Sequence, residues 1–210
     1  TCLALGKASL KNLLGDVEKA FVNATIHSVL DNFEIFQKLS IGQRENFINS
    51  LQEVVLKENE TVCNYNDEAT FFIVMEGELN VYDESELEVL KVIKAGEVFG
   101  YEEIVKIDKM KFKVKTLTKS KIKKCTINDV KKNFQNLTLK EIVHNNEIKK
   151  ILSQIFLFKS LSKKEIDKTV SAFDEVQFND NEFIVKKGEP AKHFFLVRDG
   201  HVQIIGDENK

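Results

Sequence analysis

The sequence is poor in the residues that would place it in several common classes of protein. Its 210 residues include one proline, three cysteines and no tryptophan. Cys2, Cys63 and Cys125 are widely separated and odd in number, which argues against a disulfide framework and against a zinc site of paired cysteines. The longest apolar runs have the length of a strand and fall far short of a membrane span. We therefore expect a reducing, cytoplasmic location and no transmembrane segment.

Arginine is scarce as well, although lysine is plentiful. Arg44 and Arg198 are the only arginines among 31 basic residues, which leaves 29 lysines (31 − 2 = 29). A formal net charge of −2 gives no argument for binding nucleic acid. The four histidines lack the spacing of metal ligands, and no glycine-rich ATP loop, catalytic-loop motif or nucleophile elbow occurs. The sequence thus predicts no metal site and no catalytic residue in this chain.

Hydrophobic periodicity divides the chain into helical and strand-rich parts. Helical spacing of apolar residues covers 17–30 and continues, after a turn, to about residue 51. Short strand-like runs follow, and helices resume from about 128 to 154. The expected strands lie at 54–56, 61–63, 71–75, 78–82, 87–93, 112–117 and 121–127. Residues 1–5 read as the end of a strand and residues 7–14 as a short helix.

The chain also repeats itself. The motif FQKLS at residues 36–40 returns as FKSLS at residues 158–162, an offset of 122 (158 − 36 = 122). FFIVMEG at 71–77 returns as FFLVRDG at 194–200, at nearly the same offset. A period of this length is one domain.

This period divides the chain into three parts. We expect the end of one copy in residues 1–30, a complete copy in 31–150, and the N-terminal half of a third in 151–210. Because the sequence opens on Thr1, we also expect it to be a piece of a longer chain.

Residues 95–105 carry the most informative motif. AGEVFG at 95–100 predicts a turn at Gly96 and a close approach of another group to the backbone at Gly100. A short helix is expected from Tyr101, and backbone N–H groups at its start are suited to face an anion. A lysine-rich run, 106–124, follows.

The AGEVFG motif resembles the opening of the phosphate-binding cassette of cyclic nucleotide-binding domains. Together with the repeat, the resemblance covers essentially the whole chain, most strongly at 158–161, 185–191 and 194–202. It implies an α+β fold in which an antiparallel, jelly-roll-like β-roll is flanked by N- and C-terminal helices. The chain is similar to the regulatory region of apicomplexan cGMP-dependent protein kinases, which carry four such domains, the third degenerate. The complete middle copy corresponds to that third domain.

The cassette departs from the family at the positions that the resemblance assigns to ligand binding. Tyr101 stands where the family has the glutamate that holds the ribose hydroxyl. The family's Pro-Arg-Ala-Ala segment, whose arginine holds the cyclic phosphate, corresponds to residues 109–112, which read KMKF here. A phenol cannot act as a carboxylate, and lysine lacks the planar fork that clamps a phosphate. We therefore expect a lapsed nucleotide site. Its candidate residues are Gly96, Phe99, Gly100, Tyr101, Lys109, Met110 and Lys111.

The function implied is regulatory. We expect a fragment of a cGMP-dependent serine/threonine kinase whose degenerate domain relays allosteric activation between cGMP-binding neighbours, through the helices at 17–30 and 137–152. No cofactor is expected in the fragment itself, and cGMP is expected in the neighbouring domains. The expected partners are those domains and the kinase domain of the same chain; any membrane association belongs to other parts of the parent chain. Two alternatives remain: weak nucleotide binding through Lys109 or Lys111, and docking of a protein at Lys113 and Lys115.

Several side chains have two interpretations at this point. The adjacent aromatics Phe71 and Phe72 point to opposite faces of a strand, so one should fill the roll and the other pack under the helices. Tyr101 either plugs the empty sugar site or lies exposed on its helix. Lys113 and Lys115 alternate with apolar residues, which favours a solvated strand face over an anion dock.

Overall fold

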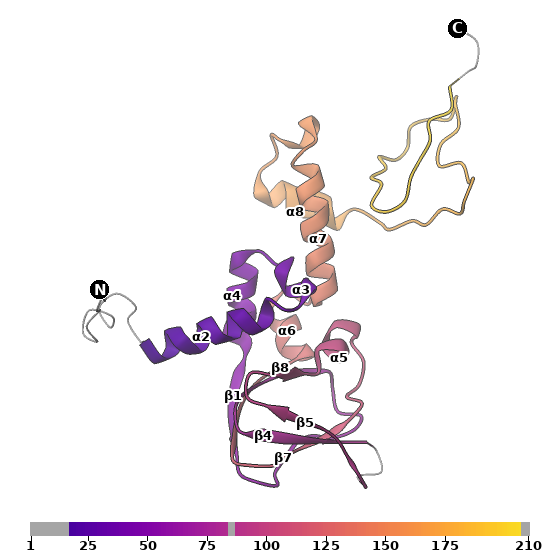
Figure 1. Ribbon diagram of the computed structural model, residues 1–210. Coiled ribbons are helices and arrows are strands. Elements are labelled where there is room, and N and C mark those ends of the chain that lie inside the picture. Colours follow the sequence, from indigo (N-terminus) through magenta and orange to yellow (C-terminus); the bar gives the residue numbers. More distant parts are fainter. Residues whose placement is uncertain (1–16, 84–86, 207–210) are drawn as a thin grey trace, which may run out of the picture. The chain divides into compact units, whose positions relative to one another are not determined.

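A computed structural model describes residues 17–83 and 87–206, with side chains from residue 19 (Figure 1). The residues expected to form a strand at 1–5 and a helix at 7–14 lie outside the described part. Helices precede and follow a block of strands, and one short helix lies within it. They are α2 (Val17–Leu30), α3 (Glu34–Gln37), α4 (Ile41–Ser50), α5 (Tyr101–Lys106), α6 (Ile127–Asn133), α7 (Leu139–Leu152), the 3-10 helix η1 (Phe156–Phe158) and α8 (Lys163–Ser171).

The strands form two four-stranded antiparallel sheets, in the orders β1-β8-β3-β6 and β2-β7-β4-β5. The sheets face each other as a roll, and helices α3, α4, α5 and α6 gather at one end of it (Figure 1). These helices and the parts of α2 and α7 that pack with them are called the helical layer. The strands are β1 (Gln52–Leu56), β2 (Thr61–Cys63), β3 (Thr70–Glu76), β4 (Glu78–Tyr82), β5 (Val89–Lys94), β6 (Val98–Phe99), β7 (Lys113–Thr116) and β8 (Ser120–Thr126). The predicted roll with flanking helices is thereby confirmed.

Strand β3 separates the two apolar clusters of the molecule. Its side chains alternate in direction, so Phe71 and Ile73 join the helical layer whereas Phe72 and Val74 fill the roll. All four are at most 2% exposed. The prediction that the paired phenylalanines divide between the two faces is correct.

Helices α4, α6, α7 and α8 begin at side-chain caps encoded locally in the sequence. Ser40, Thr126, Thr138 and Ser162 each accept a hydrogen bond from the backbone of the residue three positions on, whose side chain returns the bond. Between α6 and α7 the chain turns through Gln135 and Asn136, both left-handed, with φ of 56° and 66°. The helical stretch expected at 128–154 is therefore two helices.

Residues 173–206 belong to a second compact unit. Within the described part of this unit the chain forms turns and no strand. Asn181, Gly188 and Gly200 adopt positive φ, as their repeat partners suggest. Arg198 forms an ion pair with Glu175 at 2.9 Å.

Candidate functional site

The cassette, residues 95–112, runs from the end of β5 to the start of β7. It contains β6, which the sequence did not predict because two residues are too short for a periodic signal. The short helix predicted from Tyr101 is α5. Both ends of α5 are left-handed, with φ of 75° at Gly100 and 58° at Ile107.

The backbone of β3 comes so close to position 100 that only glycine fits there. A Cβ atom at this position would lie 1.8 Å from the carbonyl oxygen of Thr70 on β3. Its positive φ independently favours glycine. The close approach that the sequence predicted at Gly100 is thus the approach of Thr70. Gly96, in contrast, has open space around it and serves a turn at φ 88°.

Met110 lies inside the roll. Its side chain is 1% exposed and belongs to the roll cluster, against which Phe99 also packs. The ring of Phe99 stacks on Phe72 at 4.3 Å, nearly parallel. Backbone hydrogen bonds hold Met110 from both sides: its N–H donates to Asp67 at 3.0 Å, and its carbonyl accepts from Asn66 at 2.9 Å. An apolar side chain therefore occupies this part of the roll.

Tyr101 is not exposed on its helix, which was one of the two arrangements expected from the sequence. Its ring turns to the helical layer and lies 4.3 Å from the ring of Phe33 and 6.2 Å from that of Phe36. The side chain is half-buried. Burial raises the pKa of Tyr101, and a hydrogen bond from the backbone of Ile35 offsets part of that rise. The residue thus couples the cassette helix to the helices that precede the roll.

The charges around α5 are balanced. Residues 101–111 contain three carboxylates and three lysines: Glu102, Glu103 and Asp108, with Lys106, Lys109 and Lys111. Lys106 bonds to Glu102 at 2.7 Å, and Lys111 bonds to Asp108 at 3.0 Å. These bonds lower the pKa of Glu102 and of Asp108 and raise the pKa of Lys111. The cassette surface therefore carries no excess of positive charge toward an anion.

Of the seven candidate residues, the structure brings three together. Phe99, Gly100 and Met110 meet at the roll, where the Met110 methyl group would lie 3.5 Å from a Cβ at Gly100. Tyr101 faces the helical layer, and Gly96 lies at the turn before β6. Lys109 and Lys111 are exposed.

Lys113 and Lys115 lie on β7, alternating with buried Val114 and Thr116. The alternation predicted for this strand is therefore correct. The ammonium group of Lys115 lies 5.6 Å from the centre of the Tyr82 ring.

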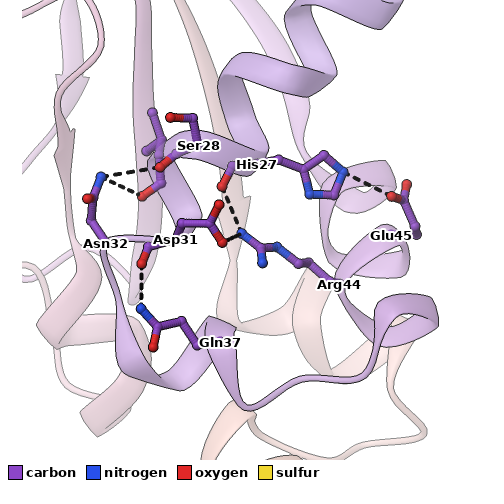
Figure 2. A network of polar contacts seen from close by, with 8 residues as sticks. His27, Ser28, Asp31, Asn32, Gln37, Arg44 and Glu45 are labelled. Atoms are coloured by element: carbon purple, nitrogen blue, oxygen red, sulfur yellow. Dashed lines mark hydrogen bonds and ion pairs between the residues drawn. The ribbon is translucent and has the colours of Figure 1, made fainter.

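A polar network joins α2 to α4, and sequence reasoning missed it (Figure 2). Arg44 donates to the carbonyl of His27 at 2.7 Å and to the carboxylate of Asp31 at 2.6 Å. His27 in turn bonds to Glu45 at 2.9 Å. The guanidinium thus binds a carbonyl in the last turn of α2, where cations are favoured. The scarcity of arginine was the only signal in the sequence that could have pointed to this residue.

A second set of polar contacts joins α7 to the turn between α3 and α4. Asn146 donates to the Lys38 carbonyl at 3.2 Å and exchanges hydrogen bonds with the Gln43 amide at 2.7 and 3.2 Å. Lys38 forms an ion pair with Glu147 at 3.1 Å. Ile142 and Val143 of α7 lie in the same apolar cluster as Phe36. We call this set of contacts the α7 clasp.

Residues 53–136 match the family model of the cyclic nucleotide-binding domain. These residues form a cyclic nucleotide-binding domain, and the antiparallel roll with its cassette helix has the architecture expected of one. Within the described residues, no helix is long and apolar enough to cross a membrane.

The whole chain is similar to cGMP-dependent protein kinases of apicomplexan parasites. It is 24% identical over 226 residues to the enzyme of Toxoplasma gondii and 22% identical over 219 residues to that of Plasmodium berghei. The chain spans 22% and 25% of the length of these relatives. A solved structure described as "cAMP bound PfPKA-R (141-441)" is 23% identical, with a TM-score of 0.47, and the match covers 79% of this chain and 59% of that one.

Replacing Gly100 with alanine should cost about 3 kcal/mol or more of unfolding free energy, because the methyl group collides with the Thr70 carbonyl. Gly42 is the matched control, since it is exposed on α4 with nothing within 4 Å of a Cβ. Gly42→Ala should stabilise by about 0.5–1 kcal/mol. Urea unfolding of both variants checks this, and equal effects would contradict the packing described at Gly100.

Tyr101→Glu should destabilise the chain by about 1–3 kcal/mol, because a carboxylate replaces a ring packed on Phe33 beside two other carboxylates. Tyr101→Phe keeps the ring and should stay within about 1 kcal/mol of the parent. Chemical unfolding at neutral pH measures both. If the two variants were equally stable, the contact between the rings of Tyr101 and Phe33 would not contribute to the free energy of unfolding.

Proposed function

We propose that this chain is part of the regulatory region of a cGMP-dependent serine/threonine protein kinase. In this proposal its complete domain, residues 31–150, has lost nucleotide binding and relays allosteric activation between cGMP-binding neighbours. The observation that carries the proposal is the buried position of Met110 at the point where the family resemblance calls for arginine.

A thioether cannot replace a guanidinium at a phosphate. The arginine of the family holds the phosphate through two parallel charge-assisted hydrogen bonds, each worth about 1.5–3 kcal/mol. Losing both weakens binding by about two to four orders of magnitude. Met110 also contributes to the roll cluster, so a ligand there would have to displace an apolar side chain.

Tyr101 supports the same proposal. It stands where the family has a glutamate for the ribose hydroxyl, and its ring packs on Phe33 and Phe36. A neutral phenol on a ring packed against the helices does not supply the carboxylate that the family uses for a sugar hydroxyl. Lysine is no equivalent of the missing arginine, because it lacks the planar fork, and the ammonium of Lys111 pairs with Asp108.

The relay runs through contacts on this domain. Tyr101 connects α5 to α3, and the α7 clasp connects the α3–α4 turn to α7. Ile142 and Phe36 share one apolar cluster, so a shift of α3 changes the packing of α7. A domain without a ligand of its own can couple two neighbours when this packing has two arrangements.

The partners of the proposed region are the neighbouring cyclic nucleotide-binding domains, which bind cGMP, and the kinase domain of the same protein. A cytoplasmic location belongs to the same proposal. Of the alternatives, weak nucleotide binding would use Lys109 or Lys111, and at Lys111 a phosphate would compete with the ion pair to Asp108. Docking of an acidic partner would use the exposed side of β7 at Lys113 and Lys115.

Breaking the α7 clasp should change the cooperativity of cGMP activation in the full-length protein. Asn146→Ala removes the bonds to the Lys38 carbonyl and the Gln43 amide, and Ile142→Val removes one methylene from the cluster. The second change costs only about 0.5–1.5 kcal/mol, so the fold survives. Kinase activity against cGMP concentration gives the Hill coefficient of each variant.

Lys140→Ala is the control, because Lys140 is exposed on the same helix. We expect its activation curve to match that of the parent. Activation curves like that of the parent for both Asn146→Ala and Ile142→Val would contradict the proposed relay.

A further inference from the structure

Helix α5, at one end of the roll, divides its residues among three sides (Figure 1). At about 100° per residue, positions 101, 104 and 105 share one side of a helix. Tyr101 and the two apolar residues on that side pack on the helical layer. Glu102 and Lys106 share a second side, where both are exposed and pair with each other at 2.7 Å. Glu103 occupies the third side, which is turned away from the helical layer.

Glu103 is buried on this third side without a partner for its charge. The residue is 7% exposed. In the part of the chain that the structure describes, its carboxylate forms no hydrogen bond and no ion pair. Among the same residues, Nε of Arg44 is the one fully enclosed side-chain polar atom without a partner, so solvent still reaches the oxygens of Glu103. Buried charges are ordinarily paired, because their desolvation is costly. The chain thus leaves an acceptor group open here.

The neighbours on which the charge of Glu103 acts show where this carboxylate lies. Burial raises the pKa of the Cys63 thiol to about 12, and the carboxylates of Asp67 and Glu103 add to the rise. Cys63 belongs to the roll cluster together with Met110. Glu103 also adds to the raised pKa of Lys111, whose main cause is a hydrogen bond to another carboxylate. The open carboxylate therefore lies on the roll side of the cassette, near Cys63 and Lys111.

A carboxylate in this place repels an anion and attracts a cation. Because its surroundings are partly desolvated, both effects are stronger there than on the surface. The lysines of the cassette do not neutralise it, since Lys106 and Lys111 pair with other carboxylates and Lys109 is exposed. The charge near the roll side of the cassette is therefore negative.

The kind of cation follows from the number of ligands. A metal ion takes several protein ligands. Across the described residues, no three metal-ligating side chains come together. A single carboxylate is instead sufficient for a guanidinium or an ammonium group, to which it accepts charge-assisted hydrogen bonds.

We propose that the cassette binds an organic cation, a guanidinium or an ammonium group, at the carboxylate of Glu103. The cation is carried by a basic side chain of a protein or by a small free molecule, and its recognition by the carboxylate is the same in both cases. This inference rests on the proposed function, because a cassette that accepts a cation at this place has given up the cyclic phosphate.

Calorimetric titration of this chain with N-acetyl-arginine amide tests the site. N-Acetyl-citrulline amide is the matched probe, since it has nearly the same shape and no charge. We expect saturable binding of the arginine probe, and binding of the citrulline probe that is at least about tenfold weaker. The probe n-propylguanidine carries the same side chain without the peptide groups. Weaker binding of this probe than of the arginine probe indicates a protein side chain as the source, and equal binding indicates a free cation.

Glu103→Gln removes the charge with little change in size, and Glu102→Gln on the exposed side of α5 is the control. Glu103→Gln should weaken binding of the arginine probe at least about tenfold, whereas Glu102→Gln should bind it as the parent does. Glu103→Gln should also unfold at the same urea concentration as the parent or at a higher one, because it leaves no buried charge unpaired.

The proposal is overturned if the parent shows no saturable binding of the arginine probe, if the citrulline probe binds equally well, or if Glu103→Gln binds like the parent. A lower urea midpoint for Glu103→Gln would also overturn it, because the carboxylate would then have a partner within the chain. Titration of the parent with cGMP tests the loss of nucleotide binding separately. A chain that binds neither the arginine probe nor cGMP would contradict the cation site and leave the proposed function standing.

Discussion

The helical layer packs on the outer face of β3 and holds the helices and the roll together. Phe36 and Phe47 lie 5.5 and 5.8 Å from Phe71 and 4.7 Å from each other, and all three are fully buried. Truncating any one to alanine costs about 3–5 kcal/mol. Because β3 also carries the roll cluster on its inner face, the helices and the roll cannot rearrange independently.

The cassette is joined to this packing from two sides. Gly100 lets α5 start against the Thr70 carbonyl, and Tyr101 extends the aromatic cluster through Phe33. On the roll side, Met110 completes the apolar interior. In the proposed role, the chain's own side chains hold the cassette in place of a ligand. In the same role, movement enters and leaves the domain through its helices.

Much of the fold could be predicted from the sequence because it is encoded locally or by repetition. Alternation placed Phe71 and Phe72 on opposite faces of a strand, and the repeat marked the domain period. The contacts of Tyr101 and Arg44 could not be predicted in this way, since their partners are distant in sequence or belong to another element. Gly100 combines the two cases. The motif predicted a close approach at this glycine, but only the structure shows that the approaching group is the carbonyl of Thr70.

A calorimetric titration of this chain with cGMP, and with cAMP in parallel, decides whether its domain has lost nucleotide binding. With Met110 inside the roll and Tyr101 on the helical layer, we expect no saturable heat at millimolar nucleotide. Saturable heat with one site per chain would contradict it. That result should be accompanied by a gain of about 2.7 kcal/mol in unfolding free energy at a hundred times the dissociation constant. The cassette would then bind nucleotide without its arginine, and the domain would sense cGMP directly.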